Sequence, residues 1–152
     1  MPDLDSLPTE FANSLRKMRG PALEGEPWAE GPPLSERRIA IVTTAGLHRR
    51  NDRPFVMGSV DYRVLPRTST RELVSTHISP NFDRSGFAED LNVVLPLDRL
   101  HELAERGVIG SVADHHYSFM GAAQIEKLAP SAADLAGHLK ADGVNGVLLV
   151  PV

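Results

Sequence analysis

The sequence predicts an α/β protein, a single domain in which helices flank a mixed or parallel sheet. A run rich in β-branched residues at 38–44 is followed by short alternating runs and by segments of helical periodicity. A second apolar run, 147–150, comes directly after a helical pattern that stops at Gly143. A right-handed crossover would place this last strand parallel to the first, and its continuous apolar character indicates burial on both faces.

Length and composition narrow the range of functions. The chain has 152 residues, which suits one domain with one sizeable core. Its formal net charge of −4 offers no basic face for nucleic acid, and no apolar run reaches the roughly 20 residues of a membrane helix. There is no cysteine, which excludes disulfides, cysteine-based zinc sites and thiol nucleophiles among these residues. The N-terminus lacks the layout of a signal peptide, so a soluble cytoplasmic protein is expected.

The chain divides into two parts of different character. Residues 1–36 are expected to form a helix and an extended arm, and residues 37–152 the α/β domain. The helix is predicted over 8–19, where apolar residues recur at helical spacing. The arm carries the only tryptophan, Trp28, which is predicted to pin it to the core because a buried aromatic contributes a large apolar area.

Shorter elements are expected between the two apolar runs. Strands are predicted at 59–66 and 72–77, and a helix at 97–106 that a glycine ends. Two further helices are expected at 120–128 and from Ser131 to about Ala141, with Pro130 separating them.

Polar residues that could carry chemistry fall at the ends of these elements. His48 follows the first strand, His77 ends the third, Asp90 precedes the helix at 97–106, and His116 lies in an irregular loop. Histidine carries protons near neutral pH, so His77, His116 and Asp90 together above one sheet edge could orient a substrate or tune a nucleophile. The alternative for each histidine is a hydrogen bond satisfied within a loop.

The turn after the first strand is a candidate for substrate binding. Thr43 and Thr44 lead into an Ala-Gly pair, and small residues let backbone amides approach an anion. A tight turn out of the sheet is the competing interpretation. Asn92, close to Asp90, is a further candidate for substrate binding. No metal is expected, since no spacing such as HExxH occurs, and neither a dinucleotide fingerprint nor a Walker A motif is present.

An ordered set of motifs resembles a known family. The motifs begin with Thr44-Ala45-Gly46-Leu47-His48 and continue through 58–66, 73–77, 90–100, 102–111, 116–121 and 143–149. From about Arg38 to the last residue, the chain resembles the glycine/sarcosine/betaine reductase selenoprotein B family, and within it the selenocysteine subunits of D-proline reductases.

The resemblance implies a subunit of a reductase that acts on amino acids or related amines. In that family the strand matching 147–150 is followed at once by selenocysteine or cysteine, the nucleophile in reductive cleavage of a C–N bond. A partner subunit would supply a pyruvoyl group that holds the amine, and a dithiol would reduce the oxidised selenium–sulfur product. This chain itself would carry no cofactor. By position, the site would be lined by His48, His77, Asp90, Asn92 and His116.

The chain departs from the family pattern at the nucleophile, because the segment that carries it is missing and no cysteine replaces it. Two accounts stay open. In one, a UGA selenocysteine codon after Val152 is read as a stop, and these residues alone show no turnover. In the other, the chain is a natural truncation that serves as a non-catalytic binding or scaffold domain of the same fold. A metal-assisted hydrolase that uses the histidines is a third alternative.

Overall fold

The computed structural model describes residues 4–17, 28–68, 70–79 and 84–152. The strands are β1 (Arg38–Thr43), β2 (Leu47–Arg49), β3 (Arg63–Pro66), β4 (Leu73–Ser75), β5 (Ser111–Val112), β6 (His115–Ser118) and β7 (Gly146–Val150). The α-helices are α1 (Thr9–Lys17), α2 (Ser85–Glu89), α3 (Leu97–Glu105) and α4 (Ile125–Ala141). Single 3₁₀ turns lie at η1 (Leu4–Ser6), η2 (Leu34–Glu36), η3 (Thr70–Glu72) and η4 (Leu91–Val93).

Strand β1 is the centre of the main sheet. On one side β7 runs parallel to it, from the pair Ile39↔Gly146 to the pair Thr43↔Val150. On the other side β5 and then β6 pair parallel with β1, and β3 lies antiparallel to β6. The main sheet therefore has five strands: β3, β6 and β1 follow in that order, β7 lies on the far side of β1, and β5 pairs with the start of β1. This confirms the predicted mixed sheet and the parallel pairing of the first and last strands.

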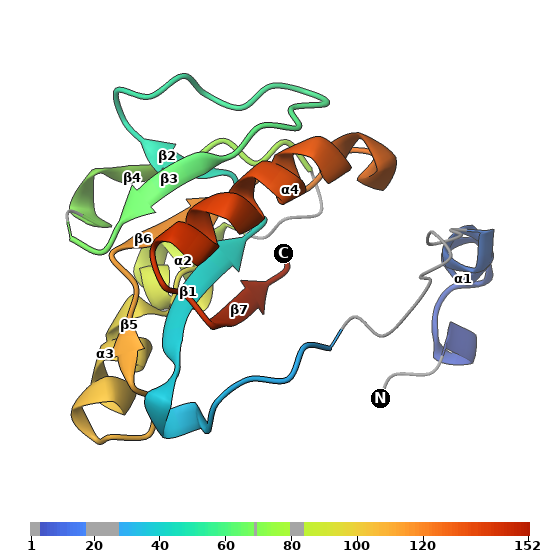
Figure 1. Cartoon of the computed structure of the whole chain (residues 1–152). Helices are drawn as coiled ribbons and strands as arrows, with labels where there is room; N and C mark the ends of the chain where they lie inside the picture. The colour runs from blue at the N-terminus through green and yellow to red at the C-terminus, as the bar shows by residue number, and fades with distance from the viewer. Residues whose placement is uncertain (1–3, 18–27, 69, 80–83) are drawn as a thin grey trace.

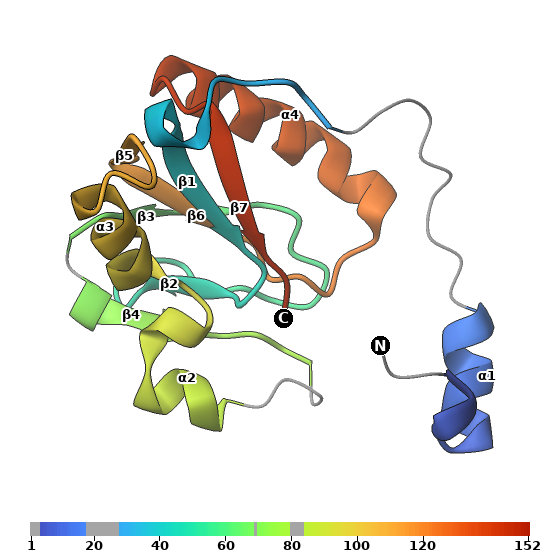
Figure 2. The same cartoon turned by 90° about the horizontal axis from the view of Figure 1, so that it is seen from below.

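Helices cover both faces of this sheet (Figures 1 and 2). Helix α4 lies across one face, and Leu135 packs there with Tyr117 and Phe119 of the β6 segment. Helix α3 lies on the opposite face, where the larger apolar cluster is centred. That cluster includes Ile39, Ile41, Leu65, Val94, Leu95, Leu97, Leu100, Ile109 and Val112. The α/β class predicted from the sequence is thus confirmed.

A second, two-stranded sheet lies beside the carboxyl end of β1. Strands β2 and β4 pair antiparallel, with Leu47 opposite Ser75 and Arg49 opposite Leu73. The chain turns from β1 into β2 at Gly46, whose φ of 62° is the left-handed conformation that glycine adopts without a steric cost. This small sheet brings the segment after β4 next to the end of β1.

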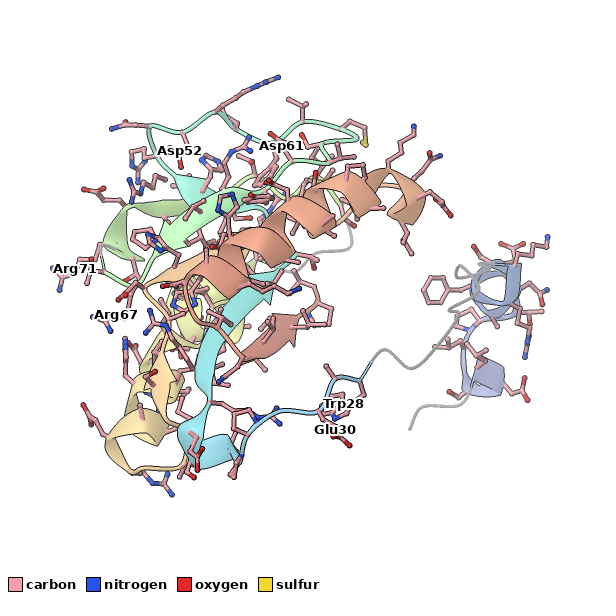
Figure 3. All side chains as sticks on the ribbon, in the orientation of Figure 1. Trp28, Glu30, Asp52, Asp61, Arg67 and Arg71 are labelled. Atoms are coloured by element: carbon pink, nitrogen blue, oxygen red, sulfur yellow. The ribbon has the colours of Figure 1, made fainter. Side chains whose placement is uncertain are left out.

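Four details differ from the prediction. His116 does not lie in an irregular loop but in strand β6, which pairs with both β1 and β3. The last strand is not buried on both faces: β7 is an edge strand, and Leu149 is 70% exposed. Helix α4 continues through Pro130, because packing of its apolar face on the sheet outweighs one lost main-chain hydrogen bond. Trp28 does not anchor the arm in the core, since its side chain is 82% exposed (Figure 3).

The N-terminal helix is confirmed as α1 over Thr9–Lys17, and the rest of the predicted span at 18–19 lies outside the described residues. Both views place α1 away from the sheet (Figures 1 and 2). Across the described residues, none of the helices combines the length and the apolar character needed to cross a membrane.

Candidate functional site at the carboxyl ends of the parallel strands

The carboxyl ends of β1, β6 and β7 lie at one end of the main sheet. From β1 the chain passes through α3 to β5 and β6 on one side, and then through α4 to β7 on the other side. The strand order therefore reverses at β1. In open α/β sheets, ligands bind in the crevice outside the strand ends at such a switch point. We therefore take this end of the sheet as the candidate site.

Thr44 links the end of β1 to the end of the chain. Its backbone N–H donates to the carbonyl of Val150 over 3.1 Å. Its Oγ1 accepts a hydrogen bond of 2.9 Å from the backbone N–H of Val152. Thr43 differs, because its buried Oγ1 accepts from the Ala45 N–H at 3.2 Å and so shapes the turn. Of the two predicted threonines, Thr44 is the one whose side chain reaches the residues after β7.

Two glycines allow His77 to lie close to this point. A Cβ at Gly46 would stand 2.8 Å from the His77 backbone nitrogen. A Cβ at Gly121 would stand 2.9 Å from both Cβ and the carbonyl oxygen of Thr44, and 3.3 Å from Nε2 of His77. Such distances are too short for any residue other than glycine. The imidazole tip of His77, Thr44 and Gly121 therefore converge where β1 and β6 end.

The environment of His77 defines its protonation. Its side chain is buried, with 4% of the residue exposed, and Nδ1 accepts a hydrogen bond of 3.2 Å from the Ser79 N–H. Arg84 donates to the His77 carbonyl oxygen. Burial, and then the positive charge of Arg84, lower the pKa of His77, so the ring is neutral near pH 7. Since Nδ1 is an acceptor, the proton is assigned to Nε2, the nitrogen that faces Gly121.

The other two predicted histidines hold the fold together. His116 is fully buried in β6, and its Nδ1 accepts the Ile41 N–H at 3.0 Å, completing the sheet where a backbone carbonyl would otherwise serve. Burial lowers the pKa of His116 to about 4, so the ring stays neutral. His48 is buried in β2, with Nδ1 2.7 Å from the Arg49 carbonyl oxygen and its ring edge-on to Phe55.

Asp90 and Asn92 form a helix cap. Asp90 Oδ1 accepts from both the backbone and the side-chain amide of Asn92, each at 2.9 Å. Asn92 in turn donates to the Asp98 carboxylate at 2.9 Å and accepts the Asp98 N–H at 3.1 Å, at the start of α3. The hydrogen bonds from Asn92 hold the pKa of Asp90 below its usual range. The pair borders a hollow of about 140 Å³ and serves to begin α3.

The structure thus brings Thr44 and His77 together, and it gives His48, His116, Asp90 and Asn92 structural hydrogen bonds elsewhere. Four contributors to the site did not emerge from the sequence. They are the close approach at Gly121, the Ser79 N–H, the Arg84 guanidinium and the backbone N–H of Val152. The feature of the sequence that could have indicated this approach is a glycine shortly after the end of each of two strands, Gly46 after β1 and Gly121 after β6. Within the described ranges, no group of three or more His, Asp or Glu side chains could hold a metal ion.

Residues 29–152 match the family described as glycine/sarcosine/betaine reductase selenoprotein B. The chain belongs to this family. The resemblance of its motifs to the family is thereby confirmed, and it covers the arm from Ala29 as well as the α/β domain.

Curated relatives share about 30% identity with the chain. It is 31% identical over 120 residues to the D-proline reductase subunit gamma of Acetoanaerobium sticklandii, covering 76% of this chain and 49% of that protein. It is 32% identical over 122 residues to the betaine reductase complex component B subunit beta of Peptoclostridium acidaminophilum, covering 76% and 28%. It is 28% identical over 122 residues to the glycine reductase complex component B subunit gamma of Carboxydothermus hydrogenoformans, covering 76% of this chain and 28% of that protein.

The chain therefore spans about half of the first of these relatives and less of the others. No solved structure is significantly similar to it.

Proposed function

We propose that this chain is the part of an amino-acid reductase subunit that presents a selenocysteine or cysteine nucleophile directly after Val152. The substrate would be an amino acid or a related amine, and the reaction would be reductive cleavage of its C–N bond. One observation carries the proposal. Thr44 holds the backbone of Val152 at the switch point of the sheet, and both Thr44 and Nε2 of His77 lie close to Gly121 there. A residue placed next along the chain would begin beside those two side chains.

The chemistry suits the groups at this point. A chalcogen nucleophile needs to be ionised near neutral pH, which a hydrogen-bond donor or a cation nearby favours. His77 offers an Nε2–H on the side of Gly121, and the Arg84 guanidinium lies on its backbone carbonyl. His77 would therefore stabilise the chalcogenolate by donating a hydrogen bond.

The proposed reaction transfers two electrons. The chalcogenolate would attack the carbon that bears the nitrogen, and the C–N electron pair would leave with the amine, which takes up a proton. A thiol would then attack the chalcogen, and the released carbon would take up a proton. The remaining chalcogen–sulfur bond would be reduced by an external dithiol, which becomes a disulfide.

The proposed reaction also requires a partner subunit that binds the amine substrate. The names of these relatives describe them as subunits, two of them as subunits of a complex component B, which supports assembly with other chains. A pyruvoyl group on such a partner would hold the amine by its carbonyl. We place the complex in the cytoplasm, where dithiol reductants are maintained.

The alternative proposal is a binding or scaffold domain of the same fold without redox chemistry. It is favoured by the absence of cysteine from all 152 residues. The two proposals differ at the codon that follows Val152: a UGA or cysteine codon supports the reductase, and TAA or TAG supports the scaffold.

The test uses the full-length protein, produced anaerobically with selenium supplementation together with its pyruvoyl-bearing partner. Amine-dependent oxidation of dithiothreitol is measured for the wild type, for His77→Gln, for His77→Ala and for the control His138→Gln on the exposed face of α4. We expect wild-type turnover, at least partial activity with His77→Gln, which keeps a donor, and a loss of about 10-fold or more with His77→Ala. Wild-type protein that turns over no proline, glycine, sarcosine or betaine would overturn the proposal.

A further inference from the structure

Strand β7 has a free edge. Among the described residues its only strand partner is β1. The carbonyl of Val150 accepts from Thr44, so Val150 turns its main-chain groups toward β1. Because these groups alternate along a strand, Val147 and Leu149 turn their N–H and C=O away from the sheet. Figure 2 shows β7 at this margin, with β1 on its inner side.

An apolar hollow lies on each face beside this edge. The hollow on the α4 face has a volume of about 550 Å³, and its walls include Leu139, Val144 and Leu149. The hollow on the α3 face measures about 310 Å³, and its walls include Leu103 and Leu148. A strand set against β7, with a helix packed on it, would fill spaces of this kind.

The edge lacks the features that prevent pairing. Val147, Leu148 and Leu149 are 43%, 38% and 70% exposed, and β7 contains no charged residue, bulge or proline. Edge strands that face solvent are normally protected by such features, or by short length or a covering segment. A five-residue apolar edge between two apolar hollows therefore indicates a surface that another strand covers.

We propose that this strand comes from the polypeptide that follows Val152 in the full-length protein, and that it pairs with β7 in parallel. The relatives are long enough, since the chain spans 49% and 28% of two of them, and the family match continues to residue 152. A parallel neighbour needs a crossover of about a dozen residues or more, as α4 provides between β6 and β7. The inference rests on the proposed function in one respect, because both place polypeptide after Val152.

Amide hydrogen exchange, resolved by residue with NMR, tests this pairing. The comparison is between residues 1–152 and the full-length chain, with cysteine in place of any selenocysteine. The amides of Leu148 and Val150, which face β1, should be protected in both proteins. The amides of Val147 and Leu149 should exchange rapidly in residues 1–152 and at least about 100-fold more slowly in the full-length chain.

Three results would overturn the proposal. Rapid exchange at Val147 and Leu149 in the full-length chain would show that the edge stays open. Protection in residues 1–152 that grows with protein concentration would assign the edge to a second copy. Protection of the full-length chain only after a partner subunit is added would assign it to that partner.

A substitution gives a second readout. Leu149→Lys should leave the thermal midpoint of residues 1–152 within a few degrees of the wild type, because the side chain is 70% exposed. The same change should destabilise the full-length chain clearly, whereas the control Val56→Lys, at a loop position 54% exposed, should not. Equal effects of Leu149→Lys on both lengths would contradict the pairing. Since these readouts need no turnover, they distinguish failure of this inference from failure of the proposed reaction.

Discussion

The hydroxyl of Thr44 and the backbone amide of Val152 lie 2.9 Å apart, and this hydrogen bond fixes the segment after β7 beside the end of β1. The bond connects residues 108 positions apart in the sequence. It places the end of the family-matching region at the switch point of the sheet, where His77 also lies.

Removal of the Thr44 hydroxyl should loosen this segment. Thr44→Val keeps the shape of the side chain but loses the acceptor for the Val152 amide. We expect a decrease of about 1 kcal/mol in the free energy of unfolding and faster exchange of the Val152 amide, while Thr44→Ser should stay close to the wild type. Urea titration and amide exchange measure both effects. Equal behaviour of the valine and serine variants would show that the hydroxyl contributes nothing.

Gly121→Ala should displace Thr44 and His77 from their positions beside residue 121. A Cβ at Gly121 would stand 2.9 Å from Thr44, and the residue also has a φ of 86°. Gly107→Ala is the matched control, because Gly107 has a φ of 69° and open space around its Cβ position. We expect Gly121→Ala to cost about 1–3 kcal/mol more than Gly107→Ala. Thermal unfolding of the two variants measures the difference, and identical midpoints would contradict the close approach.

Stability should fall below pH 6.5 because of His116. Its pKa is lowered to about 4 by burial, with His101, His115 and Arg67 acting in the same direction and Asp142 against it. Between about pH 6.5 and pH 4 this histidine is protonated in the unfolded state but still neutral in the folded state. Its contribution to the free energy of unfolding is therefore fully present above this pH range and is lost as the pH falls through it. The loss should total about 3 kcal/mol, on the order of 1.4 kcal/mol per pH unit.

The variant His116→Asn isolates this effect, since an amide oxygen can accept the Ile41 N–H without titrating. Chemical unfolding from pH 4 to pH 7 should show a shallower slope for His116→Asn than for the wild type, and the carboxylates contribute equally to both. A His116→Asn slope equal to that of the wild type would refute the assignment.

Replacement of Arg38 should be clearly destabilising. Its guanidinium bonds the carboxylates of Asp114 and Asp142 at 2.9 Å each, as well as the carbonyls of Val112 and Asp142. Arg38→Met should therefore cost about 2 kcal/mol, because these contacts join β1, the β5–β6 turn and the end of α4. Arg99→Met, which breaks an exposed pair with Glu102, should cost about 0.5 kcal/mol or less. Similar costs in urea unfolding would contradict this account.

Much of the fold could be predicted because short local patterns in the sequence mark its main strands and helices. The run from Ile39 to Val42 and the glycine that ends the last helix mark β1 and α4 without reference to distant residues. The exposure of β7 could not be predicted, since a continuous apolar run looks the same in a central strand and in an edge strand whose neighbour is not in view. The predicted break between two helices at Pro130 was wrong for a related reason, because packing against distant residues decides whether a helix continues through a proline.

The site could be predicted only in part. Thr44 and His77 follow predicted strands, and the ends of neighbouring strands meet in a sheet. The roles of His116 and Asn92 depend on strand register and on a cap six residues away, which local sequence does not reveal. The importance of Gly121 is a matter of tertiary contact alone.

The most direct test of the central proposal is mass spectrometry of the full-length protein after alkylation with iodoacetamide at pH 6, under reducing conditions and in parallel with the reductase assay. We predict that a selenocysteine or cysteine immediately after Val152 is alkylated at this pH, because a low-pKa chalcogen is already ionised there, and that activity is lost in proportion. The absence of either residue at that position, or full alkylation there with undiminished turnover, would contradict the proposal.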